Sequence, residues 1–134
     1  MKYYAYFFTR QDISPEQQIV QTAHAAFQLG VNSQRWIIDG TINEWNEAID
    51  TKPQLHLLPQ LIRPEDTHFT VVGVRNLEAL LAVESILDKF GFRYEKFFEP
   101  DLNDGEPTSI AVYPIAETSR GPLMAFNLLN IGRR

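Results

Sequence analysis

The chain has 134 residues, a net charge of −5 and no cysteine. Its length predicts one domain, spanning residues 1–134, with its own apolar core. The missing thiols exclude disulfides, thiol nucleophiles and cysteine-ligated metals. The negative charge argues against a strongly electrostatic nucleic-acid binder, although it is compatible with a local basic patch. No segment approaches the ~18 apolar residues of a membrane span, so we expect no membrane partner. The absence of cysteine fits the cytoplasmic location that we expect.

The first predicted elements are a strand over Tyr3–Thr9 and a helix that follows Ser14. The strand is apolar on both faces, which favours a central position in a sheet. Its aromatic character and the lack of a cleavage site argue against a signal peptide. Ser14 and Gln17 have the spacing of a capping box, with a proline at the first helical position. Gly30 is a natural C-terminal stop, so we expect a helix of about four turns.

Two stripes of side chains run along this predicted helix. At about 100° per residue, one stripe is apolar and is expected to face the core. The other stripe is polar and lies beside the first. It either lines a cleft or forms a half-exposed border that bonds to water and neighbouring loops. The apolar stripe comprises Ile19, Val20, Ala23, Ala26 and Phe27, and the polar stripe comprises Gln17, Gln21, His24 and Gln28.

An irregular insertion is predicted at about residues 31–66, where prolines separate short apolar pieces. A short helix is expected at 43–49, because Trp45, Ala48 and Ile49 have helical spacing. The insertion is either a lid or interface, or a packed surface segment.

The second half of the chain predicts three strands and two helices. Asn76 and Gly91 have the character of the N-cap and the stop of the first helix. The mixed polarity of 92–98 favours an edge strand, and the turn-rich loop 99–107 should join it antiparallel to the next strand, which Pro114 ends. The strands are expected at Phe69–Val74, Phe92–Phe98 and Thr108–Tyr113, and the helices at Leu77–Phe90 and Ser119–Leu129.

This order of elements predicts an α/β fold, a small mixed four-stranded sheet with helices on both faces. The first two strands enclose a crossover, so they should be parallel. Ligands of such sheets bind outside the carboxyl ends of the parallel strands. There the first strand delivers Arg10 and Asp12, and the polar stripe begins just beyond them.

The chain lacks the common phosphate-cradle and nucleophile-elbow motifs. Acidic residues in the 99–106 loop lack the spacing of a calcium loop, and the three histidines share no short ligand spacing. We therefore expect no metal and no cofactor. Asp101 or Asp104 is a candidate general base and Thr108 a candidate hydrogen-bond donor. Each of these residues also fits an ordinary turn or strand start.

Gln21-Thr-Ala-His-Ala25 resembles the Q-x-x-H-A signature of the type 2 peptidyl-tRNA hydrolases, the archaeal and eukaryotic kind. Arg10-x-Asp12 resembles the R-x-D-L opening of that family, and the later order of elements is similar over most of the chain. The resemblance implies a small, usually dimeric α/β domain with a four-stranded mixed sheet. It also implies hydrolysis of the ester that joins a peptide to tRNA, by attack of water on the ester carbonyl.

The resemblance gives each candidate residue a role. Asp104 would orient the attacking water, Thr108 would donate a hydrogen bond to it, and His24 would complete the catalytic group. Arg10 would meet phosphate of the tRNA. The implied substrate-binding residues are Arg10, Asp12, Gln17 and Gln21.

The chain departs from the family pattern at two places. Gln17 stands where the family carries a lysine, so a cation that would stabilise an oxyanion or bind phosphate is missing. The stretch Asp104–Thr108 keeps the family's aspartate-to-threonine spacing, but its glycine is shifted and Ser109 replaces a glutamine. Two functions therefore stay open. One is a divergent hydrolase of peptidyl-tRNA or a related ester, and the other is a non-catalytic binding or regulatory protein with the same fold.

Overall fold

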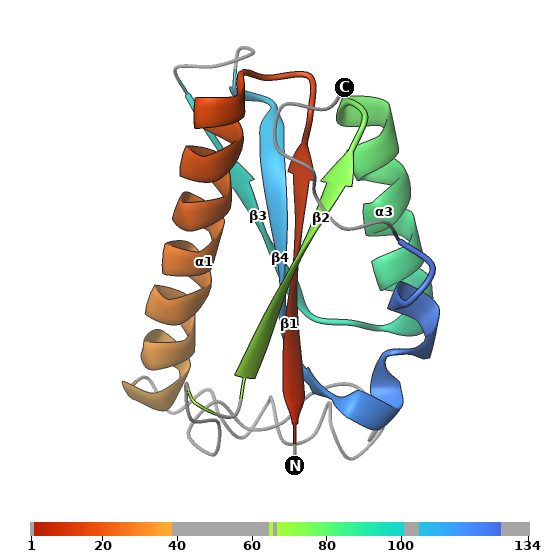
Figure 1. Ribbon diagram of the computed structural model, residues 1–134. Coiled ribbons are helices and arrows are strands. Elements are labelled where there is room, and N and C mark those ends of the chain that lie inside the picture. The colour runs from red at the N-terminus through yellow and green to blue at the C-terminus, as the bar shows by residue number, and fades with distance from the viewer. Residues whose placement is uncertain (1, 39–64, 66, 101–104, 127–134) are drawn as a thin grey trace.

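The computed structural model describes residues 2–38, 65, 67–100 and 105–126, and within them four strands form one sheet between two α-helices. The helices lie on opposite faces of the sheet (Figure 1), which confirms the predicted α/β class. The strands are β1 (Tyr3–Arg10), β2 (Thr67–Val74), β3 (Tyr94–Phe98) and β4 (Pro107–Ala116). The helices are α1 (Pro15–Ile38) and α3 (Leu77–Phe90).

The sheet has the strand order β2-β1-β4-β3. β1 pairs parallel with β2 and antiparallel with β4, and β3 pairs antiparallel with β4. The predicted parallel pair, the antiparallel hairpin, the central β1 and the edge position of β3 are all confirmed. β1 and β2 end together, because Arg10 pairs with Val74. The loops that follow these strands therefore leave the same edge of the sheet.

The apolar core is much larger on the α3 side of the sheet than on the α1 side. On the α3 side, Phe8, Leu80, Leu87 and Ile110 are fully buried among other apolar residues. The α1 side holds a smaller buried cluster of Ala5, Phe7, Ala25 and Ala111. Hydroxyl and amide side chains continue the α1 side towards the carboxyl end of β1, so polar groups fill part of this layer.

Both ends of α3 are capped by the residues that the sequence predicts. The side chain of Asn76 accepts a hydrogen bond from the backbone N–H of Ala79 at 3.0 Å. Gly91 adopts the left-handed conformation with φ 74° and ends the helix. Both caps act locally, so their residue types alone are sufficient to place the ends of the helix.

The predicted end of α1 is wrong, and its predicted buried face is correct only in part, since Ala26 packs against the α1-side core. The helix continues through Gly30 to Ile38, since a single glycine costs a helix only ~1 kcal/mol. Ile19 and Phe27, expected to face the core, are 55% and 75% exposed. Gln18 and Gln21 are instead fully buried: Nε2 of Gln18 donates to the carbonyl of Ile13, and Oε1 of Gln21 accepts from Thr108 on β4. Oε1 of Gln18 has no hydrogen-bond partner among the described residues.

Pro114 does not end β4, which runs on to Ala116. The β1–β4 register shifts between Tyr4 and Tyr6, at the level of this proline. The pairing with β3 stops at Val112. A proline at this place therefore removes no regular ladder hydrogen bond.

The predicted helix at 119–129 is also wrong where the structure describes it. Two short 3₁₀ turns take its place, at Glu117–Ser119 and Gly121–Leu123. They bring Leu123 into the α3-side core and set Phe126 edge-on to Phe8, with 5.1 Å between the ring centroids. The rest of that prediction, the helix predicted at 43–49 and most of the predicted insertion lie outside the described residues.

β2 begins at Thr67, two residues earlier than the sequence pattern indicates. β3 begins at Tyr94, two residues later than the pattern indicates. No helix in the described ranges combines the length and the apolar character needed to cross a membrane.

Candidate functional site

A register shift at the start of β4 turns Thr108 towards α1. Phe97 pairs with Ser109 and Phe98 pairs with Pro107, so one step along β3 spans two along β4. Thr108 is the extra residue of this β-bulge. Bulges re-aim a side chain relative to the alternating pattern of a strand. Thr108 and Ser109 can therefore both bond on the α1 side of the sheet, although they are consecutive residues.

Thr108 and Gln21 form the centre of a polar network at this edge of the sheet. The hydroxyl of Thr108 donates to Oε1 of Gln21 at 2.8 Å, and both residues are fully buried. Nε2 of Gln21 donates to Oε1 of Gln17 at 3.1 Å and to Oε2 of Glu99 at 3.4 Å. The structure thus brings together three of the predicted site residues, Gln17, Gln21 and Thr108.

Three hydroxyl groups form a second network next to the first. Oγ1 of Thr9 lies 2.6 Å from Oγ1 of Thr22 and 3.0 Å from Oγ of Ser109. Thr22 donates to the backbone carbonyl of Gln18 at 2.7 Å. This network links β1, β4 and α1, so it fixes the position of α1 along the strands relative to the bulge.

Arg10 lies in an ionic cluster at the end of β1. Its Nε and Nη2 donate to the two carboxylate oxygens of Asp12 at 2.9 and 2.8 Å. Its Nη1 donates to Glu106 at 3.2 Å and to the backbone carbonyl of Pro107 at 3.3 Å. The hydrogen bond to Asp12 raises the pKa of Arg10 above its ordinary value, against the opposing effect of burial. Arg10 is only 5% exposed. The carboxylates of Asp12 and Glu106 balance its positive charge at this nearly buried place.

His24 has no contact with this network among the residues that the structure describes. His24 is exposed, and its ring lies 4.8 Å from that of Phe97 at an angle of 56°. Asp104 lies outside the described residues. The residues around it are placed: Glu99 contacts Gln21, Gly105 has φ 80°, and Glu106 contacts Arg10. One end of the acidic loop therefore lies at Gln21, and the other end, at Glu106 two residues before Thr108, lies at Arg10.

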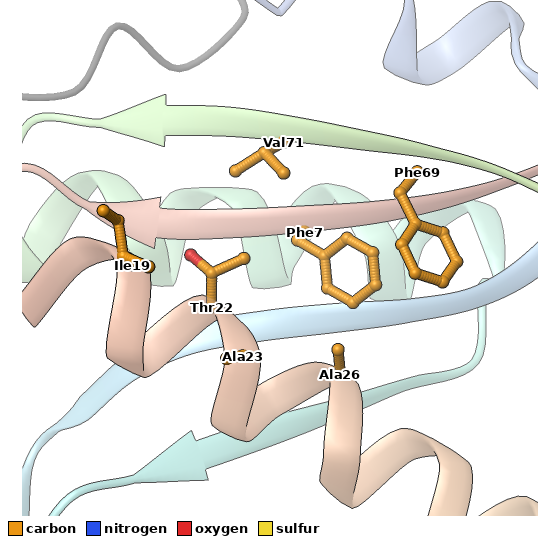
Figure 2. Close-up of a pocket in the computed structure, with 7 residues that line it drawn as sticks. All are labelled: Phe7, Ile19, Thr22, Ala23, Ala26, Phe69 and Val71. Atoms are coloured by element: carbon orange, nitrogen blue, oxygen red, sulfur yellow. The ribbon is translucent and has the colours of Figure 1, made fainter.

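An apolar groove borders the hydroxyl network between α1 and β2 (Figure 2). It has a volume of about 310 Å³. Thr22 separates it from the polar network, since the Thr22 hydroxyl bonds to Thr9. None of the described residues that line the groove has a titratable side chain. Its lining residues are Phe7, Ile19, Thr22, Ala23, Ala26, Phe69 and Val71.

The charges that contact the polar network are mainly negative. Arg10 is paired with the carboxylates of Asp12 and Glu106, and a third carboxylate, that of Glu99, accepts from Gln21. In the described ranges, no group of three or more histidine, aspartate or glutamate side chains has the geometry to hold a metal ion. The arrangement can orient a small polar molecule by hydrogen bonds, and it gives little attraction to an anion.

The sequence patterns did not assign Thr9, Thr22 and Ser109 to a common network. The sequence feature that could have indicated this network is Thr9, a hydroxyl residue that follows the apolar run of β1 and faces Thr22 on α1. Gln18 was also missed: it is fully buried and donates to the carbonyl of Ile13 at 3.0 Å. These side chains show that the candidate site extends over the end of β1 as well as the start of β4.

Comparison of the chain with models of known protein families finds no match, and comparison with curated proteins finds none either. The resemblance to type 2 peptidyl-tRNA hydrolases therefore rests on the motif residues and on the order of the elements.

Proposed function

We propose that this protein is a divergent hydrolase of the type 2 peptidyl-tRNA hydrolase kind, acting on the ester of peptidyl-tRNA or of a related acylated RNA. The observation that carries the proposal is the Thr108–Gln21 hydrogen bond. It unites the helix with the Q-x-x-H-A motif and the strand that follows Asp104. The proposal includes the fold of that family, a tRNA partner, a homodimer and a cytoplasmic location.

The direction of the central hydrogen bond defines the chemistry of Thr108. A hydroxyl has one proton and two lone pairs. The proton of Thr108 is directed at Gln21, so its oxygen would keep its lone pairs to accept a hydrogen bond from a water molecule that enters this fully buried place. Thr108 would then orient the attacking water as an acceptor, rather than as the donor that the resemblance implies. Asp104, two residues before Glu106, is the proposed general base.

Among the residues that the structure describes, stabilisation of the oxyanion would come from neutral donors in this proposal. Gln17 replaces the family lysine, and Arg10 is paired with Asp12 and Glu106. Amide N–H groups of Gln17 or of the backbone are the available kind of donor. One missing donor of this type typically costs about 10²–10³ in rate, so we expect slow turnover compared with an enzyme that has the lysine.

A second function is a non-catalytic binding or regulatory protein with the same fold. It is favoured by the saturation of the site: Gln21 and Thr108 are fully buried and satisfy each other. The excess of carboxylates around Arg10 also favours it, because tRNA phosphates would be repelled there.

The experiment that tests the proposal is incubation of N-acetylated aminoacyl-tRNA with the protein, followed by measurement of free tRNA. Deacylation above the buffer rate supports the hydrolase. Titration of tRNA, followed by fluorescence anisotropy, separates the alternatives. Binding without deacylation at excess protein supports the non-catalytic function instead, and neither binding nor deacylation rejects both tRNA proposals.

A further inference from the structure

We infer that Arg10 is a positioning residue that holds Thr108 against Gln21, and that it does not bind phosphate of a substrate. The catalytic consequence of this inference rests on the proposed hydrolase function, but its structural consequence does not. The inference rests on the four contacts of the Arg10 guanidinium, which reach the loop after β1 and the start of β4.

The guanidinium is already satisfied by the protein. Arginine has five N–H donors, and the contacts to Asp12, Glu106 and the carbonyl of Pro107 engage all three of its nitrogens. The pair with Asp12 is bidentate, the strongest geometry for a carboxylate. With the Arg10 side chain only 6% exposed, a phosphate would have to displace a carboxylate from a nearly buried site.

The two carboxylates belong to the segments that place the central pair. Asp12 lies two residues before Ser14, whose hydroxyl accepts from the backbone N–H of Gln17 in the first turn of α1. On the other side, Glu106 and Pro107 directly precede Thr108. One side chain therefore joins the start of the helix that carries Gln21 to the start of the strand that carries Thr108.

This connection acts where the regular ladder is interrupted. The bulge separates the Phe97–Ser109 pair from the Phe98–Pro107 pair, so sheet pairing alone does not fix Thr108. The contact of Arg10 with the Pro107 carbonyl fixes the preceding peptide. We expect the 2.8 Å hydrogen bond between Thr108 and Gln21 to weaken when this contact is lost.

The test uses Asp12→Asn, which removes one charge and leaves Arg10 in place. Asparagine cannot accept two hydrogen bonds in the same bidentate way. If Arg10 is a positioning residue, kcat on N-acetylated aminoacyl-tRNA falls at least about tenfold while KM stays within about twofold. If Arg10 binds phosphate, the freed guanidinium lowers KM at low salt and leaves kcat unchanged, which would overturn the inference. Glu117→Gln, the same chemical change at an exposed residue, is the matched control.

A second variant, Arg10→Gln, tests the charge itself through the salt dependence of tRNA binding. A phosphate contact contributes about 0.7–0.9 to the slope of log binding constant against log salt concentration. A positioning residue leaves the slope unchanged, and a decrease of that size contradicts the inference. If Arg10→Gln does not fold, the Asp12→Asn result stands alone.

A readout without RNA keeps the inference separate from the proposed function. The side-chain amide signal of Gln21 in an NMR spectrum reports its bonds to Gln17 and Glu99, and amide exchange over residues 105–109 reports the start of β4. Asp12→Asn should shift that signal and speed up that exchange, whereas Glu117→Gln should change neither. An unchanged Gln21 signal and unchanged exchange in Asp12→Asn would refute the positioning role, even if the protein hydrolyses no ester.

Discussion

The Thr108 hydroxyl and the Gln21 side-chain amide form a buried hydrogen bond of 2.8 Å between residues separated by 87 positions in the chain. The bond joins the bulged start of β4 to the second turn of α1. The bond is bordered by Gln17, Glu99 and the hydroxyl network. It therefore lies where the end of β1, the start of α1, the residue after β3 and the start of β4 meet. The candidate site is built around this bond.

Replacing Thr108 with valine should destabilise the protein by about 1–3 kcal/mol, because the buried Oε1 of Gln21 loses its donor. The free energy of unfolding, measured by urea denaturation, checks this value. Thr70→Val on the edge strand β2 is the matched control, since Thr70 is only partly buried. Equal stability of Thr108→Val and the natural protein would show that the bond contributes nothing to the fold.

Replacing Gly30 with alanine should stabilise the protein by about 0.5–1 kcal/mol, because Gly30 lies inside α1. A Cβ at this position has no neighbouring atom within 4 Å. Thermal unfolding should therefore occur at a higher temperature. Gly91→Ala is the contrasting variant and should lower stability, since Gly91 has φ 74°. A destabilising Gly30→Ala would contradict a helix that continues through this position.

Alkaline pH should destabilise the protein partly through Tyr113. Burial, and then the hydrogen bond to Glu95 at 2.7 Å, raise the pKa of this phenol. A raised pKa in the folded state gives stability that is complete below the pKa of the unfolded chain, about 10, and is lost as the pH rises above it.

Tyr113→Phe removes this ionisable group. Its unfolding free energy should therefore fall less steeply above about pH 10 than that of the natural protein. Denaturation curves at several pH values compare the two slopes. Identical slopes would mean that Tyr113 does not contribute to the alkaline loss of stability.

The fold was largely predictable because its signals are local or periodic. Asn76 and Gly91 define the ends of α3, and the apolar run of Tyr3–Thr9 defines a central strand. The parallel and antiparallel pairings follow from the lengths of the connections. These features need no knowledge of distant partners.

The orientation of α1 was not predictable from its own sequence. Its apolar stripe suggests the buried face, yet Gln21 is buried and Phe27 is exposed. The reason is a partner far away in the chain: the bulge at Thr108 provides the group that satisfies the buried amide. A helical pattern contains no information about such a partner, so the amphipathic argument fails at the candidate site.

The role of Arg10 was hidden for a similar reason. The motif Arg10-x-Asp12 is visible in the sequence, but its third member, Glu106, lies 96 residues away. From the motif alone the arginine is a reasonable phosphate contact. The structure shows a guanidinium that is nearly buried between two carboxylates.

The most direct test of the proposed hydrolase is the single-turnover rate of deacylation of N-acetylated aminoacyl-tRNA with the protein in excess. A catalytic site at the Thr108–Gln21 pair predicts a rate above buffer for the natural protein and for Thr70→Val. It predicts a loss of about 10²–10⁴-fold, down to the buffer rate if turnover is slow, for Thr108→Val. A natural protein that deacylates no faster than buffer, or a Thr108→Val variant with the full rate, would contradict a catalytic site at the Thr108–Gln21 pair.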